Sequence, residues 1–352
     1  MKALRVEAFG PLANLRIEEI SDAALPPKSV RIEIEAAGVN PSDIGVALGR
    51  FSQVTLPRTP GRDFAGRVIE GDPKYVGMRV WGSGGGVLGL TADGSHAEHM
   101  ILPEDAVIAR PARLSAEQAA VAGVPFVTAW SALVESAGFT AGEWVIVAGA
   151  AGAVGMSAIT LARALGGKAI ALVRSDTSTA SLDDMAVEAV LRSDVDDVPK
   201  AVMELTGGRG AAVALNGVGA SVFPALAGSL AKDGRMVIYS VLGGRETPLD
   251  LFAFYRRRLR LYGLDTASFD LHEIARLYGK FGPLFESGAI DPPAIAARIA
   301  LSNAREAYER VNRGDAGKVV IVPDSATKTE AAFVAEAGSR SIPDEASLAV
   351  PV

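Results

Sequence analysis

A glycine-rich turn at residues 149–155 constrains the fold of this 352-residue sequence more than any other feature. The turn follows the apolar run 144–148, which is typical of a buried strand, and it leads directly into a helical pattern. In such a unit the first glycine permits a tight turn, the second lets the backbone approach a pyrophosphate, and the third lets the helix pack on the strand. Amide groups at the helix start would hold the phosphates. The sequence therefore predicts a dinucleotide site made by Gly149, Ala150, Gly152, Ala153, Val154 and Gly155.

Strand-like and helix-like patterns alternate through the middle of the chain. Apolar strands are expected at 169–173, 187–191, 211–216 and 235–240, and helices at 154–165, 179–188, 198–206 and 221–231. This alternation predicts an α/β fold with a parallel sheet covered by helices on both faces, which is the doubly wound or Rossmann arrangement.

The two ends of the chain differ from this central part. Short alternating runs, such as residues 30–34, predict a β-rich module at the start. Helical patterns precede an apolar strand at 318–322, which we expect to return to that module. The sequence thus predicts a β-rich domain at 1–122 completed by 267–323, a nucleotide-binding domain at 123–266, and a mobile tail at 324–352.

Composition excludes several classes of protein and site. The sequence has no cysteine, which excludes disulfides, cysteine nucleophiles and cysteine-containing zinc sites. The net charge of −6 argues against nucleic acid or an anionic membrane as the main partner, so we expect a small molecule. The uncharged run 144–162 has the length of a membrane span, but its three glycines break it. The first ten residues lack a signal-like apolar segment, which favours a cytoplasmic location.

Two further features carry no binding site in this interpretation. His96 and His99 are an odd number of positions apart, so an extended segment would place them on opposite faces, and no metal site is predicted. The glycine run at 82–89 is not followed by a helical pattern, and we interpret it as a flexible loop.

The end of the second expected strand indicates which dinucleotide is bound. An NAD site would usually carry an acidic side chain there, whereas this strand ends in Arg174-Ser175. A guanidinium and a hydroxyl suit a 2′-phosphate, so the sequence favours NADP(H). Asp176 keeps NAD open as an alternative, and Arg174 could also be a solvated loop residue.

Seven motifs follow one another along the chain: AAGVNPSD at 36–43, LPRTPGRDFAGRV at 56–68, DGSHAEH at 93–99, VTAWSAL at 127–133, AGAAGAVG at 148–155, ALNGVGA at 214–220 and GKVVIV at 317–322. Their order resembles the quinone oxidoreductase (zeta-crystallin-like) branch of the medium-chain dehydrogenase/reductase superfamily. The resemblance implies a GroES-like catalytic domain beside the Rossmann domain, with the active site in the cleft between them. It also implies a homodimer.

The resemblance places no zinc ligands in this sequence. The zinc-dependent relatives carry a cysteine where residues 39–41 stand and a histidine where residues 61–63 stand. Zinc would polarise an ordinary carbonyl, so an acceptor reduced without it must delocalise negative charge itself, as quinones and enones do. The sequence thus predicts a zinc-independent, NADPH-dependent reductase of quinones or α,β-unsaturated carbonyl compounds.

The resemblance also implies roles for residues near the reacting atoms. Asn40 would lie near the nicotinamide and the substrate oxygen, and Thr128 would hold the carboxamide of the cofactor. The alternatives are that Asn40 is a turn residue and that Thr128 is a buried helix hydroxyl. Phe51 stands where many relatives have a tyrosine, and it would form a hydrophobic wall for a flat ring.

Further residues are expected along the nucleotide. Arg192 would join Arg174 and Ser175 at the 2′-phosphate, unless it is simply an exposed arginine. The remaining residues assigned to the cofactor site are Asn216, Val218, Leu242, Gly243 and Lys318.

The sub-branch stays open at this point. Asn216 resembles the residue of the enoyl thioester reductases at this position, whereas Phe51 replaces the tyrosine that is their proposed proton donor. The alternatives to a quinone or enone reductase are therefore a 2-enoyl thioester (acyl-CoA or acyl-carrier-protein) reductase and a non-catalytic NADPH-binding structural or regulatory protein.

Overall fold

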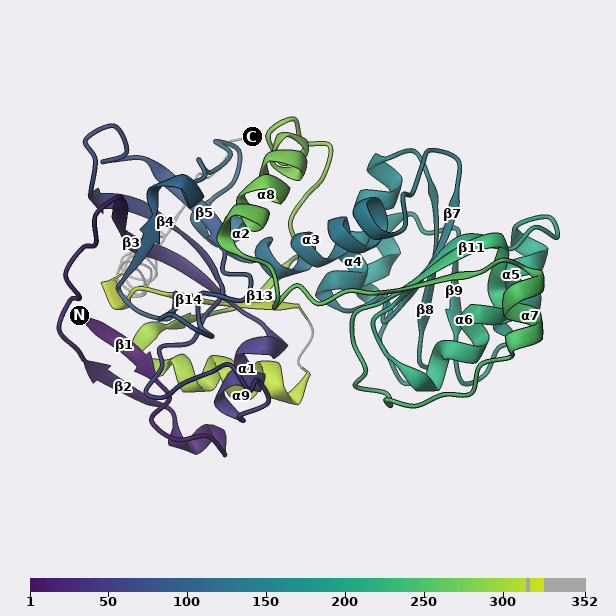
Figure 1. Cartoon of the computed structure of the whole chain (residues 1–352), viewed down its shortest axis with the longest axis horizontal. Helices are drawn as coiled ribbons and strands as arrows, with labels where there is room; N and C mark the ends of the chain where they lie inside the picture. The colour runs from purple at the N-terminus through teal and green to yellow at the C-terminus, as the bar shows by residue number, and fades with distance from the viewer. Residues whose placement is uncertain (315–316, 326–352) are drawn as a thin grey trace, which may run out of the picture.

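The computed structural model describes residues 1–314 and 317–325, which form two lobes (Figure 1). Both ends of the described chain lie in the first lobe, and the middle of the chain builds the second. The predicted tail at 324–352 lies outside the described residues except for Asp324 and Ser325. Within the described ranges, no helix is both long enough and apolar enough to cross a membrane.

The second lobe contains a six-stranded parallel sheet in the order β12-β11-β10-β7-β8-β9. Alternate residues of the central strand β7 (Trp144–Ala148) pack into different cores: Val145 and Val147 face one core, and Ile146 and Ala148 face the other. Helix α4 packs in the first core and α5 and α6 pack in the second, which confirms the predicted doubly wound sheet. The other elements of this lobe are β8 (Lys168–Val173), β9 (Ala189–Arg192), β10 (Ala211–Asn216), β11 (Leu230–Ile238), β12 (Arg260–Gly263), α4 (Ala153–Ala164), α5 (Val198–Leu205), α6 (Phe223–Ser229) and α7 (Leu251–Arg256).

Two of the predicted helices in this lobe differ from the structure. The helix expected at 179–188 is wrong: only the 3-10 helix η4 (Ala180–Met185) forms, and Ala186 after it is left-handed with φ of 46°. Serine, threonine and aspartate are frequent in this segment, and they favour local turns over a helix. The helix expected at 221–231 is shorter, because η5 (Ala220–Val222) precedes α6 and Leu230 already belongs to β11.

The first lobe is organised around the long strand β3 (Ser29–Val39). This strand pairs antiparallel with β4 (Asp63–Glu70), β6 (His99–Pro103) and β14 (Lys318–Val322), so the terminal strand returns to the first module as predicted. The sequence analysis missed β13 (Ile295–Ala300), which lies parallel to β14. The other elements are β1 (Lys2–Arg5), β2 (Arg16–Glu19), β5 (Arg79–Ser83), α1 (Pro41–Ala47), α9 (Ala304–Arg313), η1 (Leu12–Asn14), η2 (Glu104–Ala106) and η6 (Leu301–Asn303).

Aromatic side chains of the first lobe pack towards the helix Gly123–Trp130, which in turn contacts α4 of the second lobe. Trp81 of β5 lies edge-on to Tyr278, with ring centroids 4.6 Å apart, and Phe126 packs in the same way on Phe285 at 4.7 Å. These rings belong to one apolar core that continues from the first lobe to Val145 of the second sheet. The elements at this junction are α2 (Ala116–Ala120), α3 (Gly123–Trp130), the π-helix η3 (Ser131–Ser136) and α8 (Leu271–Glu286).

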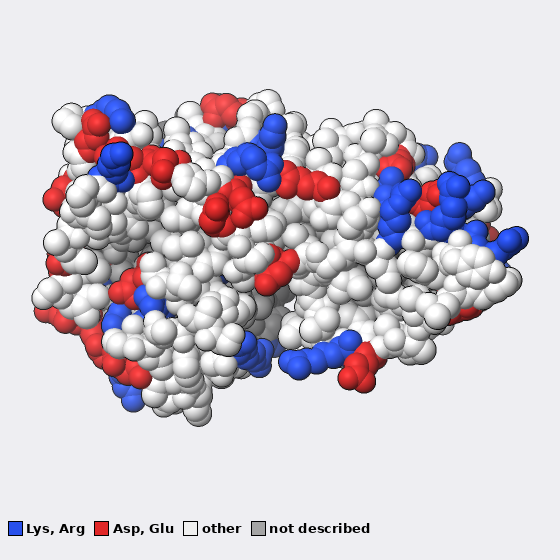
Figure 2. Space-filling view, in the orientation of Figure 1, with Lys and Arg blue, Asp and Glu red and all other residues white. Residues whose placement is uncertain are grey.

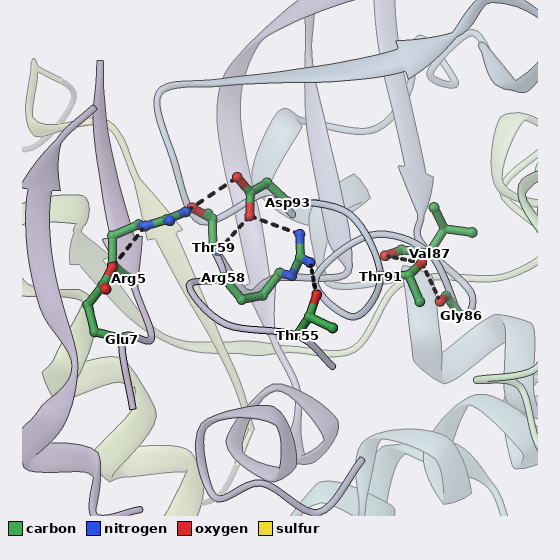
Figure 3. Close-up of polar contacts among 9 residues, drawn as sticks. All are labelled: Arg5, Glu7, Thr55, Arg58, Thr59, Gly86, Val87, Thr91 and Asp93. Atoms are coloured by element: carbon green, nitrogen blue, oxygen red, sulfur yellow. Dashed lines mark hydrogen bonds and ion pairs between the residues drawn. The ribbon is translucent and has the colours of Figure 1, made fainter. Parts of the chain in front are cut away.

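A carboxylate ties the loop that follows Phe51 to the start of the chain (Figure 3). Asp93 Oδ1 accepts hydrogen bonds from the Thr59 amide at 2.8 Å and from Arg58 Nη1 at 3.2 Å. Asp93 Oδ2 accepts a bond from Arg5 Nη1 at 3.3 Å. The segment up to residue 59 is therefore held against β1 by one acidic side chain.

Candidate active site

The glycine-rich turn has the geometry that the sequence predicts. Gly149 has φ of 73°, in the left-handed region that favours glycine, and its amide donates to the carbonyl oxygen of Leu172 at 3.0 Å. Gly152 precedes the first residue of α4. A Cβ atom on Gly155 would lie 2.4 Å from the carbonyl oxygen of Gly149, so only glycine allows α4 to approach the turn this closely. Ala150, Ala153 and Val154 complete the turn and the helix start.

The segments after β10 and β11 lie against this turn. A Cβ atom on Gly149 would lie 3.5 Å from Val218 Cγ2, and the Gly243 amide donates to the carbonyl oxygen of Val218 at 2.7 Å. Leu242, beside Gly243, is 81% exposed and therefore free to contact a ligand. The structure thus brings three of the predicted cofactor residues to the carboxyl edge of the sheet, where doubly wound folds bind ligands.

Asn216 shapes the turn after β10. Its Oδ1 accepts bonds from the amides of Gly219 at 2.7 Å and Val218 at 3.1 Å, and its Nδ2 donates to the carbonyl oxygen of Gly219 at 3.1 Å. The side chain is fully buried. Any effect of Asn216 on a cofactor would therefore pass through the turn.

Arg174, Ser175 and Arg192 meet where β8 and β9 end. Arg192 Nη1 donates to the carbonyl oxygens of Arg174 at 2.9 Å and Thr177 at 3.0 Å. Arg174 is paired with Asp176 at 2.9 Å, and its side chain is 70% exposed. The structure therefore brings the two predicted cations to the same loop, with Arg192 bonded to its backbone and the Arg174 guanidinium held only by a surface ion pair.

The sequence analysis missed Asp194 at the same place. Its carboxylate accepts bonds from the Ser175 hydroxyl at 2.6 Å and from the Ser175 amide at 2.8 Å. These bonds, with the nearby charge of Arg174, hold the pKa of Asp194 below its usual range. The Ser175 hydroxyl donates its hydrogen bond to Asp194, so towards a ligand it can act only as an acceptor.

Asn40 lies inside a buried network of charges. Its Nδ2 donates to Asp63 Oδ2 at 2.8 Å, and its Oδ1 accepts a bond from Lys318 Nζ at 2.6 Å. Lys318 also donates to the carbonyl oxygen of Val39 at 3.0 Å, and burial lowers the pKa of its ammonium group. Asn40 is only 2% exposed. Its carboxamide therefore bridges an ammonium and a carboxylate. Lys318 is itself buried, so it contacts Asn40 from inside the protein.

Asp63 connects this network to the junction between the lobes. Both of its carboxylate oxygens lie 2.9 Å from the amide nitrogen of Val124 in the first turn of α3. A Cβ atom on Gly123 would lie 2.1 Å from Asp63 Oδ1, so glycine is required there. Thr128, on the same helix, is buried. Asp63 thus positions the helix that carries Thr128.

Two more buried ionisable groups lie close to Asn40 in the sequence or in space. Asp43 is fully buried, and its Oδ2 accepts a bond from the Asn40 amide at 2.8 Å. Burial raises the pKa of Asp43 to about 7, and the negative charge of Asp63 adds to that rise. Arg62 is also buried, and burial lowers the pKa of its guanidinium. The sequence analysis quoted both residues inside motifs without assigning them to the site. The feature that could have identified them is a charged residue type among small and apolar neighbours in the sequence.

Phe51 packs on α1, the helix that begins after Asn40. A Cβ atom on Gly45 would lie 2.8 Å from Phe51 Cε2, so the ring rests against this glycine. Phe51 also packs beside a small apolar cluster that contains Val54 and Leu90. The ring is half-buried, which is compatible with the predicted wall.

The glycine run at 82–89 corrects the prediction of a flexible loop. The Gly86 amide donates to the carbonyl oxygen of Phe269 at 2.8 Å, and a Cβ atom on Gly86 would lie 2.2 Å from the carbonyl oxygen of Ala267. Thr91 donates from its hydroxyl to the Gly86 carbonyl oxygen at 3.3 Å, which closes the turn (Figure 3). The glycines therefore serve close packing against the segment that precedes α8.

The two histidines considered above face different partners. His96 is buried, with Nδ1 2.8 Å from the Tyr308 hydroxyl, and burial lowers its pKa to about 4. His99 Nδ1 lies 3.1 Å from Asp22 Oδ1. In the part of the chain that the structure describes, no three histidine, aspartate or glutamate side chains are grouped as metal ligands.

Comparisons with known proteins agree with this architecture. Residues 26–112 match the family described as alcohol dehydrogenase GroES-like domain, and residues 153–279 match zinc-binding dehydrogenase. A zinc-type alcohol dehydrogenase-like protein of Schizosaccharomyces pombe is 36% identical over 82% of this chain and 86% of its own length. Human quinone oxidoreductase is 30% identical over 92% of this chain and 98% of its own length. The chain belongs to the quinone oxidoreductase branch of the medium-chain dehydrogenase/reductase superfamily.

Solved structures support the same assignment. A mycobacterial quinone oxidoreductase superposes with a TM-score of 0.79 at 26% identity, covering 92% of this chain and 100% of that one. A mycobacterial relative in complex with NADPH gives a TM-score of 0.78 at 27% identity, with the same coverage. As a member of this branch, the protein is an oxidoreductase with a GroES-like part and a nucleotide-binding part.

The buried Asp43 should make stability depend on pH. The folded state keeps the Asp43 proton up to a pKa of about 7, whereas the unfolded chain releases it near 3.8. The free energy of unfolding should therefore fall as pH rises through this window, by roughly 4 kcal/mol. Asp43→Asn keeps an acceptor for the Asn40 amide but cannot ionise. Urea unfolding should show the variant gaining stability over the wild type between pH 5 and pH 8; an equal difference at both values would contradict the assignment.

Proposed function

We propose that this protein is a zinc-independent, NADPH-dependent reductase of quinones or α,β-unsaturated carbonyl compounds. The observation that carries the proposal is the nature of the groups at the two positions where zinc-dependent relatives hold the metal. Asn40 has its carboxamide engaged by Lys318 and Asp63, and Arg62 is a buried cation. A guanidinium repels a metal ion and has no lone pair to ligate it, so these residues do not fit zinc.

The glycine turn supports the cofactor part of the proposal. Gly149 has the left-handed φ that favours glycine, the space beside Gly155 admits no side chain, and the first amides of α4 are available to phosphate oxygens. Thr128 would hold the nicotinamide carboxamide, and Val218, Leu242 and Gly243 would lie along the cofactor. NADPH, when bound, supplies the hydride.

The preference for NADP(H) is supported by the cations at the ends of β8 and β9. Arg174 is held by one exposed ion pair, which is worth at most about 1 kcal/mol, so a 2′-phosphate can displace Asp176. Arg192 lies beside it. Asp176 and Asp194 are the groups that would instead favour NAD, because carboxylates accept bonds from a ribose hydroxyl and repel a phosphate.

The acceptor follows from the electrostatics of the site. Without a Lewis acid, the negative charge that forms on reduction must be delocalised by the substrate itself, as in a quinone or an enone. Phe51 would provide an apolar surface for a flat ring. Asn216 uses its carboxamide within its own turn, so the enoyl thioester alternative rests on the sequence resemblance alone.

Turnover measurements test the proposal directly. Purified protein in buffer with EDTA should oxidise NADPH, followed at 340 nm, when a quinone or an enone is added. Turnover of crotonyl thioesters alone would instead identify an enoyl thioester reductase. Tight NADPH binding without oxidation by any acceptor of a broad panel would refute the enzymatic proposal in favour of a structural or regulatory role.

Arg174→Ala should separate the two cofactors. Loss of a charge-assisted bond to the 2′-phosphate should weaken NADPH binding by roughly tenfold or more and leave NADH binding nearly unchanged. Fluorescence titration of each cofactor gives the two dissociation constants. Arg209→Ala, an exposed arginine elsewhere in the same lobe, is the matched control. Equal losses for both cofactors in Arg174→Ala would remove the 2′-phosphate assignment.

We also propose that two copies associate through α7 and β12. Helix α7 exposes Leu251, Phe252 and Tyr255 by 68%, 67% and 60%, and β12 is an edge strand of the sheet. An exposed edge beside apolar side chains is typical of an interface. Figure 2 shows Lys and Arg gathered towards the outer end of this lobe. Two copies of such a face would carry like charges and could not pair with each other through them. The contact would therefore come from the exposed apolar side chains of α7.

Light scattering coupled to gel filtration tests the association. The wild type should elute at about twice the chain mass of 36.4 kDa. The double variant Phe252→Ser, Tyr255→Ser should shift to the monomer mass, because it removes much of the apolar area. Phe9→Ser, at an exposed phenylalanine of the first lobe, should not. A wild type that elutes as a monomer at all concentrations would refute the dimer.

A further inference from the structure

Tyr239 carries an unpartnered hydroxyl at the carboxyl edge of the second sheet. The residue directly follows β11, and its amide donates to the carbonyl oxygen of Asn216, the last residue of β10, at 3.2 Å. Its ring is half-buried and packs on the core that contains Val147 and Leu215. Among the described residues, no group hydrogen-bonds its hydroxyl, and burial alone shifts its pKa. The sequence analysis did not assign this tyrosine to the site.

Gly217 leaves the space that the Tyr239 hydroxyl occupies. A Cβ atom on Gly217 would lie 2.5 Å from Tyr239 Oη and 2.8 Å from two carbon atoms of the ring. The φ angle of Gly217 is outside the left-handed region, so the backbone of the turn does not itself require glycine there. Asn216 fixes the same turn through its carboxamide. The missing side chain at position 217 therefore admits the phenol, which lies against the turn that follows β10.

The Tyr239 hydroxyl is open to a ligand and keeps its proton. Tyr278 provides a contrast, because its hydroxyl also lacks a partner but is enclosed by the protein. The oxygen of Tyr239 is not enclosed in this way, and the residue is only half-buried. Burial raises the pKa of Tyr239, so the phenol is protonated at neutral pH and has a hydrogen bond to donate.

The order of the strands indicates which half of a dinucleotide would reach this hydroxyl. The sheet runs β12-β11-β10-β7-β8-β9, with the glycine turn after β7 and Arg174 after β8. A dinucleotide crosses the carboxyl edge of such a sheet with its pyrophosphate on the glycine turn. If the adenosine half lies over β8, the nicotinamide half must extend the other way, over β10 and β11. Gly217 and Tyr239 follow these two strands.

We propose that the Tyr239 hydroxyl donates a hydrogen bond to the nicotinamide half of the bound dinucleotide, and that Gly217 is the positioning residue that admits the phenol. This rests on the proposed function, which places the dinucleotide on the glycine turn. The groups that can accept the bond are the oxygens of the nicotinamide ribose and of the carboxamide. The adenosine half lies beyond the reach of Tyr239, so the bond should act on one half of the cofactor only.

Tyr239→Phe removes the donor and keeps the ring. Calorimetric titration should show NADP⁺ binding about threefold to tenfold more weakly than to the wild type, which is the range for one neutral hydrogen bond. Adenosine 2′,5′-bisphosphate, a fragment that lacks the nicotinamide half, should bind both proteins equally. Tyr75→Phe, at a half-buried tyrosine of the first lobe, is the matched control and should bind both ligands as the wild type does. An unchanged affinity for NADP⁺ in Tyr239→Phe, or an equal loss for both ligands, would overturn the proposal.

Thermal unfolding distinguishes a ligand contact from a structural one. Because the hydroxyl has no partner within the described protein, its removal should leave the melting temperature without ligand unchanged or slightly raised. The rise in melting temperature on addition of NADP⁺ should be smaller in Tyr239→Phe than in the wild type, because weaker binding stabilises less. A lower melting temperature without ligand, together with an equal rise on addition of NADP⁺, would assign the hydroxyl a structural role.

The part played by Gly217 is tested with a second variant and a double variant. Gly217→Ala places a methyl group where the phenol lies, so it should displace the hydroxyl and weaken NADP⁺ about as much as Tyr239→Phe does. Once the bond is lost, displacing the ring removes nothing more, so the double variant should bind no more weakly than either single one. Losses that multiply in the double variant would show that Gly217 does not act through Tyr239.

These titrations also separate the inference from the proposed function. If the wild type binds NADP⁺ but reduces no acceptor, the proposed function fails and the titrations still decide the role of Tyr239. If the protein prefers NAD⁺, the same comparison is made with NAD⁺ and 5′-AMP. Where turnover is found, Tyr239→Phe should raise KM for the reduced cofactor and leave kcat nearly unchanged. A large fall in kcat with an unchanged affinity for the cofactor would instead assign the phenol to proton donation, and it would overturn the proposal.

Discussion

The carboxylate of Asp63 is the interaction on which the arrangement of the site depends. It lies buried at the start of β4, where it accepts one bond from Asn40 in the first lobe and another from Val124 at the start of α3. Lys318 balances its charge through Asn40. Removing one member of such a buried set leaves an uncompensated charge, which typically costs about 3–5 kcal/mol. Loss of this contact between the two lobes would therefore lower the stability of the folded protein substantially.

The contacts of α3 carry this link to the nucleotide site. The helix starts on Asp63 and packs along α4, and α4 begins at the glycine turn. A shift of Asp63 would therefore displace both the side chain of Thr128 and the amides that we propose hold the phosphates. The aromatic contact between Phe126 of α3 and Phe285 of α8 supports the same junction from the first lobe. Binding groups on one lobe and charged groups on the other are held in register by packing rather than by a flexible linker.

Several parts of the fold followed from local pattern alone. The glycine turn was predicted because its spacing between a strand and a helix admits few other structures, and the φ of Gly149 agrees. The doubly wound sheet followed from the alternation of elements. The pattern failed at 179–188, where polar residues form a 3-10 turn, and at Leu230, because an apolar residue does not show by itself whether it ends a helix or begins a strand. β13 was missed because three of its six residues are alanine, which is not enriched in strands.

The sequence by itself determined the fold class, the dinucleotide turn and the absence of cysteine ligands, because these depend on residue type and on neighbours close in the chain. Only the tertiary structure decided what the charged residues do. Asn40, Asp63 and Lys318 are far apart in the sequence and become one network when β3, β4 and β14 pair. Ser175 meets Asp194 only when β8 and β9 lie side by side. A side chain's free hydrogen-bonding capacity depends on such long-range partners, which no local pattern records.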